Sequence, residues 1–374
     1  MGGSIAYHLA RAKRRVLVVE RDDVAAAPSA SWASGGGIRR QGRHRAEAAL
    51  AIEAIARWPR LEEELGADLH YRQGGGLFVA ESDDEAERVA RFVERQHAAG
   101  LTDVRLLDRL EIRAIVPGIA EQVVAGSYSP ADGHADPALT AHAFAEAARS
   151  AGAAYWTGTP CEALRTRGER VAGVRTARGD VEADTVVLAA GAWSDELARA
   201  IGLRLPIRTA VYQMLRSTPA PDGLLAPVLS AIGRALSLKQ LPDGAFLLGG
   251  GWPGEATPDR RGYAVLESSV AFNWETACAV LPAVARQRVD RAWCGLEAHS
   301  IDDVPFIGPV PGIDGLVLAL GFSGHGFAIA PAVGRAVADA IAGRPVPELD
   351  MLAPARMARF DAAEVTAFLD AARA

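Results

Sequence analysis

The sequence lacks the features that mark several large protein classes. It has only three cysteines, Cys161, Cys278 and Cys294, and no CxxC spacing, which argues against a disulfide framework and a cysteine-bound zinc. No apolar run approaches the roughly 18 residues that a membrane-spanning helix needs. The net charge is −6 with no polybasic block, so nothing indicates a nucleic-acid partner. We therefore expect a soluble, cytoplasmic protein without a bound metal.

Lysine is also scarce. It occurs only at Lys13 and Lys239, so arginine carries nearly all of the positive charge. Glycine, by contrast, occurs 38 times, and several glycines are grouped in short runs. The 374 residues are enough for two domains, or for one large α/β domain with an insertion.

The stretch Gly2–Glu20 has the order glycine, helix, strand, acid. A glycine pair opens a segment with apolar residues spaced by three and four, and Val16–Val19 then form a short apolar strand before Glu20. This order is the second half of a Rossmann βαβ unit, in which the helix start lies against a pyrophosphate and the acid reaches the ribose hydroxyls. The alternative is an amphipathic helix and strand that bind nothing.

The first half of that unit is missing from the sequence. Gly2 would be the third glycine of the GxGxxG pattern, so the first strand and two glycines should precede Met1. We expect the natural protein to begin about ten residues upstream.

Two later segments also have glycines next to the end of a predicted strand or the start of a predicted helix. Thr185–Ser194 (TVVLAAGAWS) predicts a buried parallel strand that ends in a small-residue turn. Gly321–Phe327 (GFSGHGF) leads into a predicted helix over about residues 328–342. Ser31, Ser34 and the glycines after them also offer hydroxyl and backbone N–H groups that suit a phosphate or a flavin edge.

The intervening segments predict a different kind of structure. Residues 205–303 contain short strands at hairpin spacing, with Asp243-Gly244 as a turn, and a helix over about 264–281. His70–Ala80 predicts paired strands around glycines, and residues 106–118 predict a short helix. Asp83–Ala99 predicts a surface helix capped by Ser82.

Taken together, these motifs resemble the D-amino acid oxidase-like family of FAD-dependent oxidoreductases, in the branch of sarcosine and glycine oxidases and related amino-acid dehydrogenases. DGHADP at 132–137 and WCGLEAHSIDDVPFIGP at 293–309 extend the resemblance over nearly the whole chain. The implied fold class is α/β: a Rossmann-like FAD-binding domain, with its first strand missing, and an inserted antiparallel α+β substrate domain. The implied FAD-binding domain comprises 1–67, 132–206 and 306–374, and the substrate domain 68–131 and 207–305.

The resemblance also implies a set of cofactor contacts. Gly2 would face the pyrophosphate, Glu20 the adenosine ribose, and the backbone of Cys161 the adenine. The loop 321–326 would approach the pyrimidine edge of the flavin, where backbone N–H groups stabilise negative charge. The full set is Gly2, Glu20, Arg21, Ser31, Ser34, Gly35, Gly36, Cys161, Ala190, Gly191, Trp193, Gly321, Ser323, Gly324, His325 and Gly326.

The implied reaction is oxidation of the C–N bond of an amino acid or a secondary amine. A cation would hold the substrate carboxylate, and we select Arg39 first and Arg40 next, although a solvated basic turn is the alternative. His325 is the other active-site candidate, the alternative being a loop histidine that holds the backbone.

Three departures from the family pattern refine this expectation. Glu297 stands where the glycine oxidase-like branch has an arginine, so that carboxylate anchor is absent. Ala328 follows GFSGHGF where some sarcosine oxidase-like members have a lysine that helps O2 react, which favours a dehydrogenase. Gly295 rather than Cys294 occupies the position of covalent attachment, so we expect non-covalent FAD. The electron acceptor stays open, and the rival hypotheses are a flavin-deficient remnant and an NAD(P)-dependent dehydrogenase.

Overall fold

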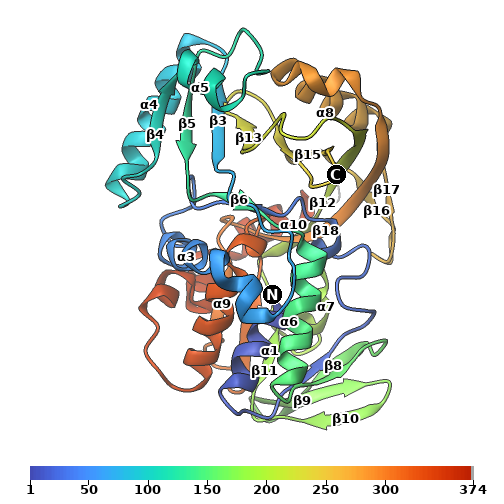
Figure 1. Ribbon diagram of the computed structural model, residues 1–374. Coiled ribbons are helices and arrows are strands. Elements are labelled where there is room, and N and C mark those ends of the chain that lie inside the picture. Colours follow the sequence, from blue (N-terminus) through green and yellow to red (C-terminus); the bar gives the residue numbers. More distant parts are fainter. Residues whose placement is uncertain (372–374) are drawn as a thin grey trace.

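The computed structural model describes residues 1–371, which form a helix-rich half and a half built on one large sheet (Figure 1). Within this range no helix is both long and apolar enough to cross a bilayer, and no three potential metal-binding side chains gather at one point. The helices are α1 (Gly2–Arg11), α2 (Ala30–Ala33), α3 (Ala48–Leu65), α4 (Asp83–Ala98), α5 (Arg109–Ile115), α6 (Pro137–Ser150), α7 (Ser194–Arg199), α8 (Glu267–Val280), α9 (Gly326–Ile341) and α10 (Ala362–Asp370), with 3-10 turns η1 (Gly191–Trp193), η2 (Pro282–Arg286), η3 (Pro347–Leu352) and η4 (Pro354–Arg359).

The large sheet has eight strands in the order β18-β12-β15-β14-β13-β3-β5-β4. Neighbours are antiparallel except β13 and β3, and the apolar residues of one face pack under α8. The strands are β3 (Gly76–Ala80), β4 (Arg105–Asp108), β5 (Ala125–Ser129), β12 (Ile207–Pro219), β13 (Val228–Ala231), β14 (Ser237–Gln240), β15 (Ala245–Gly249) and β18 (Val289–Ser300). They come from residues 76–129 and 207–300, and the predicted division into domains stays a prediction.

Two smaller parallel pairs lie in the helix-rich half. β1 (Leu17–Val19) pairs with β7 (Ala154–Trp156), and β11 (Val186–Leu188) pairs with β20 (Leu316–Leu320), which also pairs with β19 (Phe306–Pro309). Within residues 1–371, β1 and β11 each have one neighbour only, so each leaves one edge without a ladder partner. The other small sheets are a hairpin set of β8 (Cys161–Arg167), β9 (Arg170–Thr176) and β10 (Gly179–Glu182), the pair β2 (Gly37–Ile38) with β6 (Gly133–His134), and the pair β16 (Glu255–Ala256) with β17 (Tyr263–Ala264).

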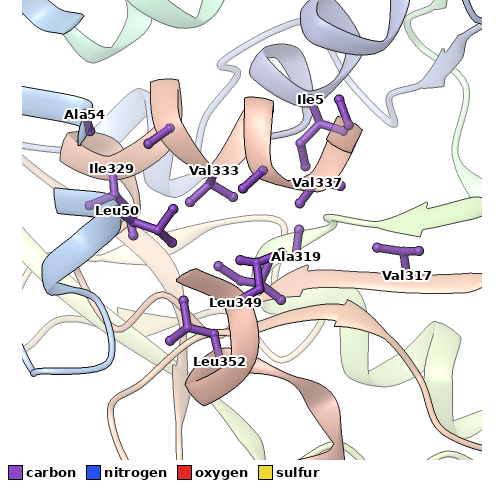
Figure 2. Close-up of a cluster of buried hydrophobic side chains, with 14 of the residues drawn as sticks. Ile5, Leu50, Ala54, Val317, Ala319, Ile329, Val333, Val337, Leu349 and Leu352 are labelled. Atoms are coloured by element: carbon purple, nitrogen blue, oxygen red, sulfur yellow. The ribbon is translucent and has the colours of Figure 1, made fainter. Parts of the chain in front are cut away.

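Helix α9 is the centre of the helix-rich half. Ile329 packs beside Leu50 of α3, and Val337 lies near Ile5 of α1 (Figure 2). Where α1 and α9 cross, Gly334 has no side chain, and a Cβ there would lie 2.8 Å from the backbone of Ser4. The Ser4 hydroxyl donates a buried hydrogen bond of 2.8 Å to the carbonyl of Ala330. This close crossing fixes the start of α1 against α9.

Most predicted elements form, and two predictions are wrong in part. α1 begins at Gly2, and Ser82 caps α4 by accepting from the Glu85 N–H. Residues 70–75 do not form a strand, because Gly74 packs directly on the backbone of Ala226 and Gly75, at φ +88°, lies against the Tyr128 ring. The predicted helix over 106–118 is shorter, since its first residues belong to edge strand β4.

Candidate cofactor and active site

One large cavity, of about 1250 Å³, lies in the helix-rich half and reaches the large sheet. It is lined by the start of α1, by β1, by the end of β11 with η1, and by the loop 321–327. Three segments that are far apart in the sequence therefore share one cavity. The unpaired edges of β1 and β11 contribute to the same wall.

All but three of the predicted cofactor contacts line this cavity. The exceptions are Gly35, Gly36 and His325, which lie outside its wall. The residues brought together are Gly2, Glu20, Arg21, Ser31, Ser34, Cys161, Ala190, Gly191, Trp193, Gly321, Ser323, Gly324 and Gly326. Their contact with FAD remains a prediction, but their convergence is a property of the fold.

The α1 end of the cavity has the chemistry of a dinucleotide site. The first turn of α1 holds no acidic residue and no side-chain cap, so its N–H groups and helix dipole can meet an anion. Burial raises the pKa of Glu20, which accepts a 3.1 Å hydrogen bond from the Asp22 N–H. Next to it, the Arg21 guanidinium lies 4.4 Å from the centre of the Trp193 ring. These groups fit the diphosphate and ribose of FAD.

The α9 end of the cavity is a tight loop of left-handed residues. Gly321 and Gly324 have φ of +73° and +81°, and Ser323 also has a positive φ. The Ser323 hydroxyl accepts a 3.2 Å hydrogen bond from the Ser300 N–H, which fixes the loop to β18. Because no side chain caps α9, its first N–H groups are available to a ligand.

His325 is held from behind by a buried acid. Its Nδ1 lies 3.1 Å from Glu47 Oε2, and Glu47 is fully buried at the start of α3. The other Glu47 oxygen has no hydrogen-bond partner among residues 1–371. The contact ties the N-terminus of α9 to that of α3, which agrees with the alternative that His325 positions the loop.

The two candidate arginines differ sharply in their surroundings. Burial lowers the pKa of Arg39 against the opposing charges of Asp132 and Glu47. Its half-buried guanidinium lies 5.1 Å from the centre of the Phe78 ring and forms no ion pair in the part of the chain described. Arg40 instead forms an ion pair with Asp103, and its N–H donates to Asp132 Oδ1 at 3.0 Å. Neither arginine lines the cavity, and the ion pair leaves Arg40 the weaker candidate.

Lys239 was not predicted as a site residue, and Arg39 and Arg40 were preferred to Arg43 of the same loop. Lys239 is 4 % exposed, and within residues 1–371 its Nζ makes one hydrogen bond, of 3.4 Å to the Ala135 carbonyl, beside Gly36. Burial lowers the pKa of Lys239 to about 7, and burial likewise lowers that of Arg43 to about 10. A polar residue within the short strand Ser237–Gln240 was the available signal, but its approach to Gly36 depends on tertiary structure.

Two of the departures from the family pattern concern side chains near the cavity. Glu297 lines it, and its Oε2 is buried without a hydrogen bond within residues 1–371, while His299 Nε2 lies 3.6 Å away. Cys294 points toward the β16–β17 hairpin, where its Sγ donates to the Ala264 carbonyl at 3.5 Å. Burial raises the pKa of Cys294 to about 11, so its thiol is a poor nucleophile.

Comparisons with known proteins agree with this site. Residues 1–340 match the family described as FAD dependent oxidoreductase (DAO). Glycine oxidase of Pseudomonas aeruginosa is 32% identical, with 91% of each chain covered. Human mitochondrial dimethylglycine dehydrogenase is 27% identical over 98% of this chain, which spans 44% of that longer protein.

Solved structures show the same likeness. L-proline dehydrogenase from P. horikoshii superposes with a TM-score of 0.85 and 28% identity over 96% of this chain and 95% of its own. Glycine oxidase from Bacillus cereus superposes with a TM-score of 0.79 and 26% identity, over 93% of this chain and 96% of its own. The predicted fold class and the predicted FAD cofactor are thus confirmed. From its sequence and its fold, the chain belongs to the D-amino acid oxidase-like (DAO) family of FAD-dependent oxidoreductases.

Proposed function

We propose that this protein uses FAD to oxidise the C–N bond of an amino acid or a secondary amine, giving an imine that water hydrolyses. The observation that carries the proposal is the convergence of the α1 start, the β11 turn and the α9 loop on one cavity. The names of the relatives, which refer to glycine, dimethylglycine and L-proline, support a small amino acid or an N-substituted amino acid as substrate.

Each wall of the cavity has a role in this proposal. Bound FAD would supply the hydride acceptor. The first turn of α1 would hold its diphosphate and Glu20 its ribose, while the uncapped start of α9 would stabilise negative charge on the flavin ring. The Glu47 contact would keep His325 and the loop before α9 in place.

The substrate would be oriented by charge. Arg39 is our first candidate for the carboxylate because it is half-buried and forms no ion pair within residues 1–371, although Asp132 and Glu47 raise its pKa. Lys239 is the second such cation, since its one hydrogen bond is to a carbonyl. Glu297 would repel a carboxylate and attract a cationic amine on its side of the cavity.

The electron acceptor can be tested directly. We propose a dehydrogenase that passes electrons to a carrier, because Ala328 takes the position of the lysine that aids O2 reaction in some relatives. Peroxide formed per imine, measured on the purified holoprotein without added acceptor, should be low. Rapid, stoichiometric peroxide would show an oxidase instead.

The mode of flavin attachment is a separate question. Cys294 supports non-covalent FAD, because its thiol points toward the β16–β17 hairpin and its raised pKa makes it a poor nucleophile. Acid precipitation should therefore leave the flavin in the supernatant, and yellow precipitated protein would refute this assignment.

A flavin-deficient remnant is the second candidate. A visible flavin spectrum of the purified protein separates the two. For a protein with flavin, anaerobic bleaching by a panel of amino acids and N-methyl amines would then identify the substrate. A cytoplasmic location stays a prediction.

A further inference from the structure

A hairpin from the large-sheet half reaches across to the cofactor cavity. β16 (Glu255–Ala256) and β17 (Tyr263–Ala264) pair only with each other within the described chain, and the loop 257–262 joins them (Figure 1). Asp259 and Arg261 at the tip of this loop line the cavity together with Arg21, Trp193 and Glu196. The tip therefore forms part of the wall beside η1 and α7.

The residue between them, Arg260, fastens the tip to η1 and α7 of the helix-rich half and to β12 of the large sheet. Its Nη1 donates to the Ala192 carbonyl at 2.5 Å, to the Thr209 hydroxyl at 2.9 Å and to Asp195 Oδ1 at 3.1 Å. Its Nη2 forms an ion pair with Glu196. The Arg260 side chain is 18% exposed, whereas its neighbours Asp259 and Arg261 are exposed residues.

The other attachments of the hairpin lie at its base, where Cys294 Sγ donates to the Ala264 carbonyl at 3.5 Å and the Gly254 N–H, just before β16, donates to the Val211 carbonyl at 3.1 Å. Each strand has only two residues, and the nearest ring contact is Tyr263 to Trp32 at 5.9 Å between centres. Within the loop, Thr257 Oγ1 donates to Asp259 Oδ1 at 2.6 Å, which shapes the tip without anchoring it. Charge-assisted hydrogen bonds are the stronger kind, so the position of the tip depends mainly on Arg260.

We propose that Arg260 is a positioning residue that straps the β16–β17 hairpin over the cavity wall and so slows the release of the cofactor. The inference rests on the proposed binding of FAD in this cavity. Arg260 acts through the tip it holds, because its own guanidinium is directed at Ala192, Thr209 and the acids of α7.

The test compares Arg260→Ala with Arg216→Ala. Arg216 is a matched control because it also bridges two acids, Asp243 and Asp290, and none of the three lines the cavity. The first measurement is the rate at which flavin fluorescence appears after the holoprotein is diluted. We expect Arg260→Ala to lose FAD about tenfold faster, and Arg216→Ala to stay within about twofold of the unaltered protein.

The second measurement is the rate of tryptic cleavage after Arg261, which does not need flavin. It should rise in Arg260→Ala and stay unchanged in Arg216→Ala, since a loop that opens locally more often is cleaved faster. If Arg260→Ala does not fold, Glu196→Gln, at a side chain 59% exposed, should move both rates in the same direction by less. An unchanged FAD release rate or an unchanged cleavage rate overturns the proposal. If the unaltered protein takes up no FAD, the proposed function fails, and the cleavage comparison still decides whether Arg260 holds the tip.

Discussion

At the scale of single residues, the main feature is a group of cations, one buried (Lys239) and two half-buried (Arg39 and Arg43), that form no ion pair within residues 1–371. Arg39, Arg43 and Lys239 all have pKa values lowered by burial, and none has an ion pair within residues 1–371. A buried charge without a partner costs stability, so its presence indicates a ligand or a solvent that is part of the working protein. The substrate carboxylate is the ligand that the proposed reaction provides.

Replacing Arg39 by methionine should therefore weaken substrate binding more than turnover. Loss of a charged hydrogen bond costs about 1.5–3 kcal/mol, which predicts a KM raised by roughly 10- to 100-fold with a smaller fall in kcat. Steady-state kinetics with an artificial acceptor would measure both. Arg45→Met, an exposed position in the same loop, is the control and should behave like the unaltered protein. An unchanged KM in Arg39→Met would move the assignment to Lys239.

Lys239 gives a prediction for stability against pH. Its folded pKa of about 7 is below the ordinary 10.5, so between these values the unfolded chain binds more protons and stability rises with pH. Lys239→Met removes this titration. The methionine variant should be more stable than the unaltered protein at pH 7, and its advantage should shrink by on the order of 1 kcal/mol per pH unit up to pH 9. Urea unfolding at pH 7, 8 and 9 checks this, and a constant difference would refute it.

At the scale of elements, local sequence patterns predicted whether a segment is a helix or a strand better than they predicted which segments pack together. The Ser82 cap and Pro137 in a first turn mark α4 and α6 within a residue or two. The glycines before β3 were misjudged because their role is to allow close contact with Ala226 and Tyr128, which are distant in sequence. β4 was assigned to a helix because an edge strand has no distinct apolar pattern.

The crossing of α1 and α9 yields a prediction at this scale. Gly334→Ala would gain about 0.5–1 kcal/mol from helix propensity. The added Cβ, however, lies 2.8 Å from the Ser4 backbone, and overpacking costs about 1–3 kcal/mol, so the net effect should be a loss of stability. Chemical unfolding measures it, with Gly37→Ala as the control, since a Cβ there meets no atom within 4 Å. Equal stability of Gly334→Ala and the unaltered protein would contradict this packing.

At the scale of the whole molecule, the sequence predicted the segments of the site but not their side-chain partners. The family resemblance predicted that Gly2, Gly191 and Gly324 contact one cofactor, and all three line the same cavity. The pairs Glu47–His325 and Arg260–Glu196 join residues 278 and 64 positions apart, and no local pattern specifies such contacts. The burial of Lys239 beside Gly36 likewise follows from how the two halves meet.

The most direct test of the central claim is amide hydrogen exchange with and without FAD, read by mass spectrometry over the whole chain. We predict that FAD slows exchange in residues 2–5, 189–193 and 321–327 together, because all three segments line the same cavity. Residues 105–115, far from the cavity wall, should not change. Protection confined to one of the three segments, or absent from all of them, would contradict the account.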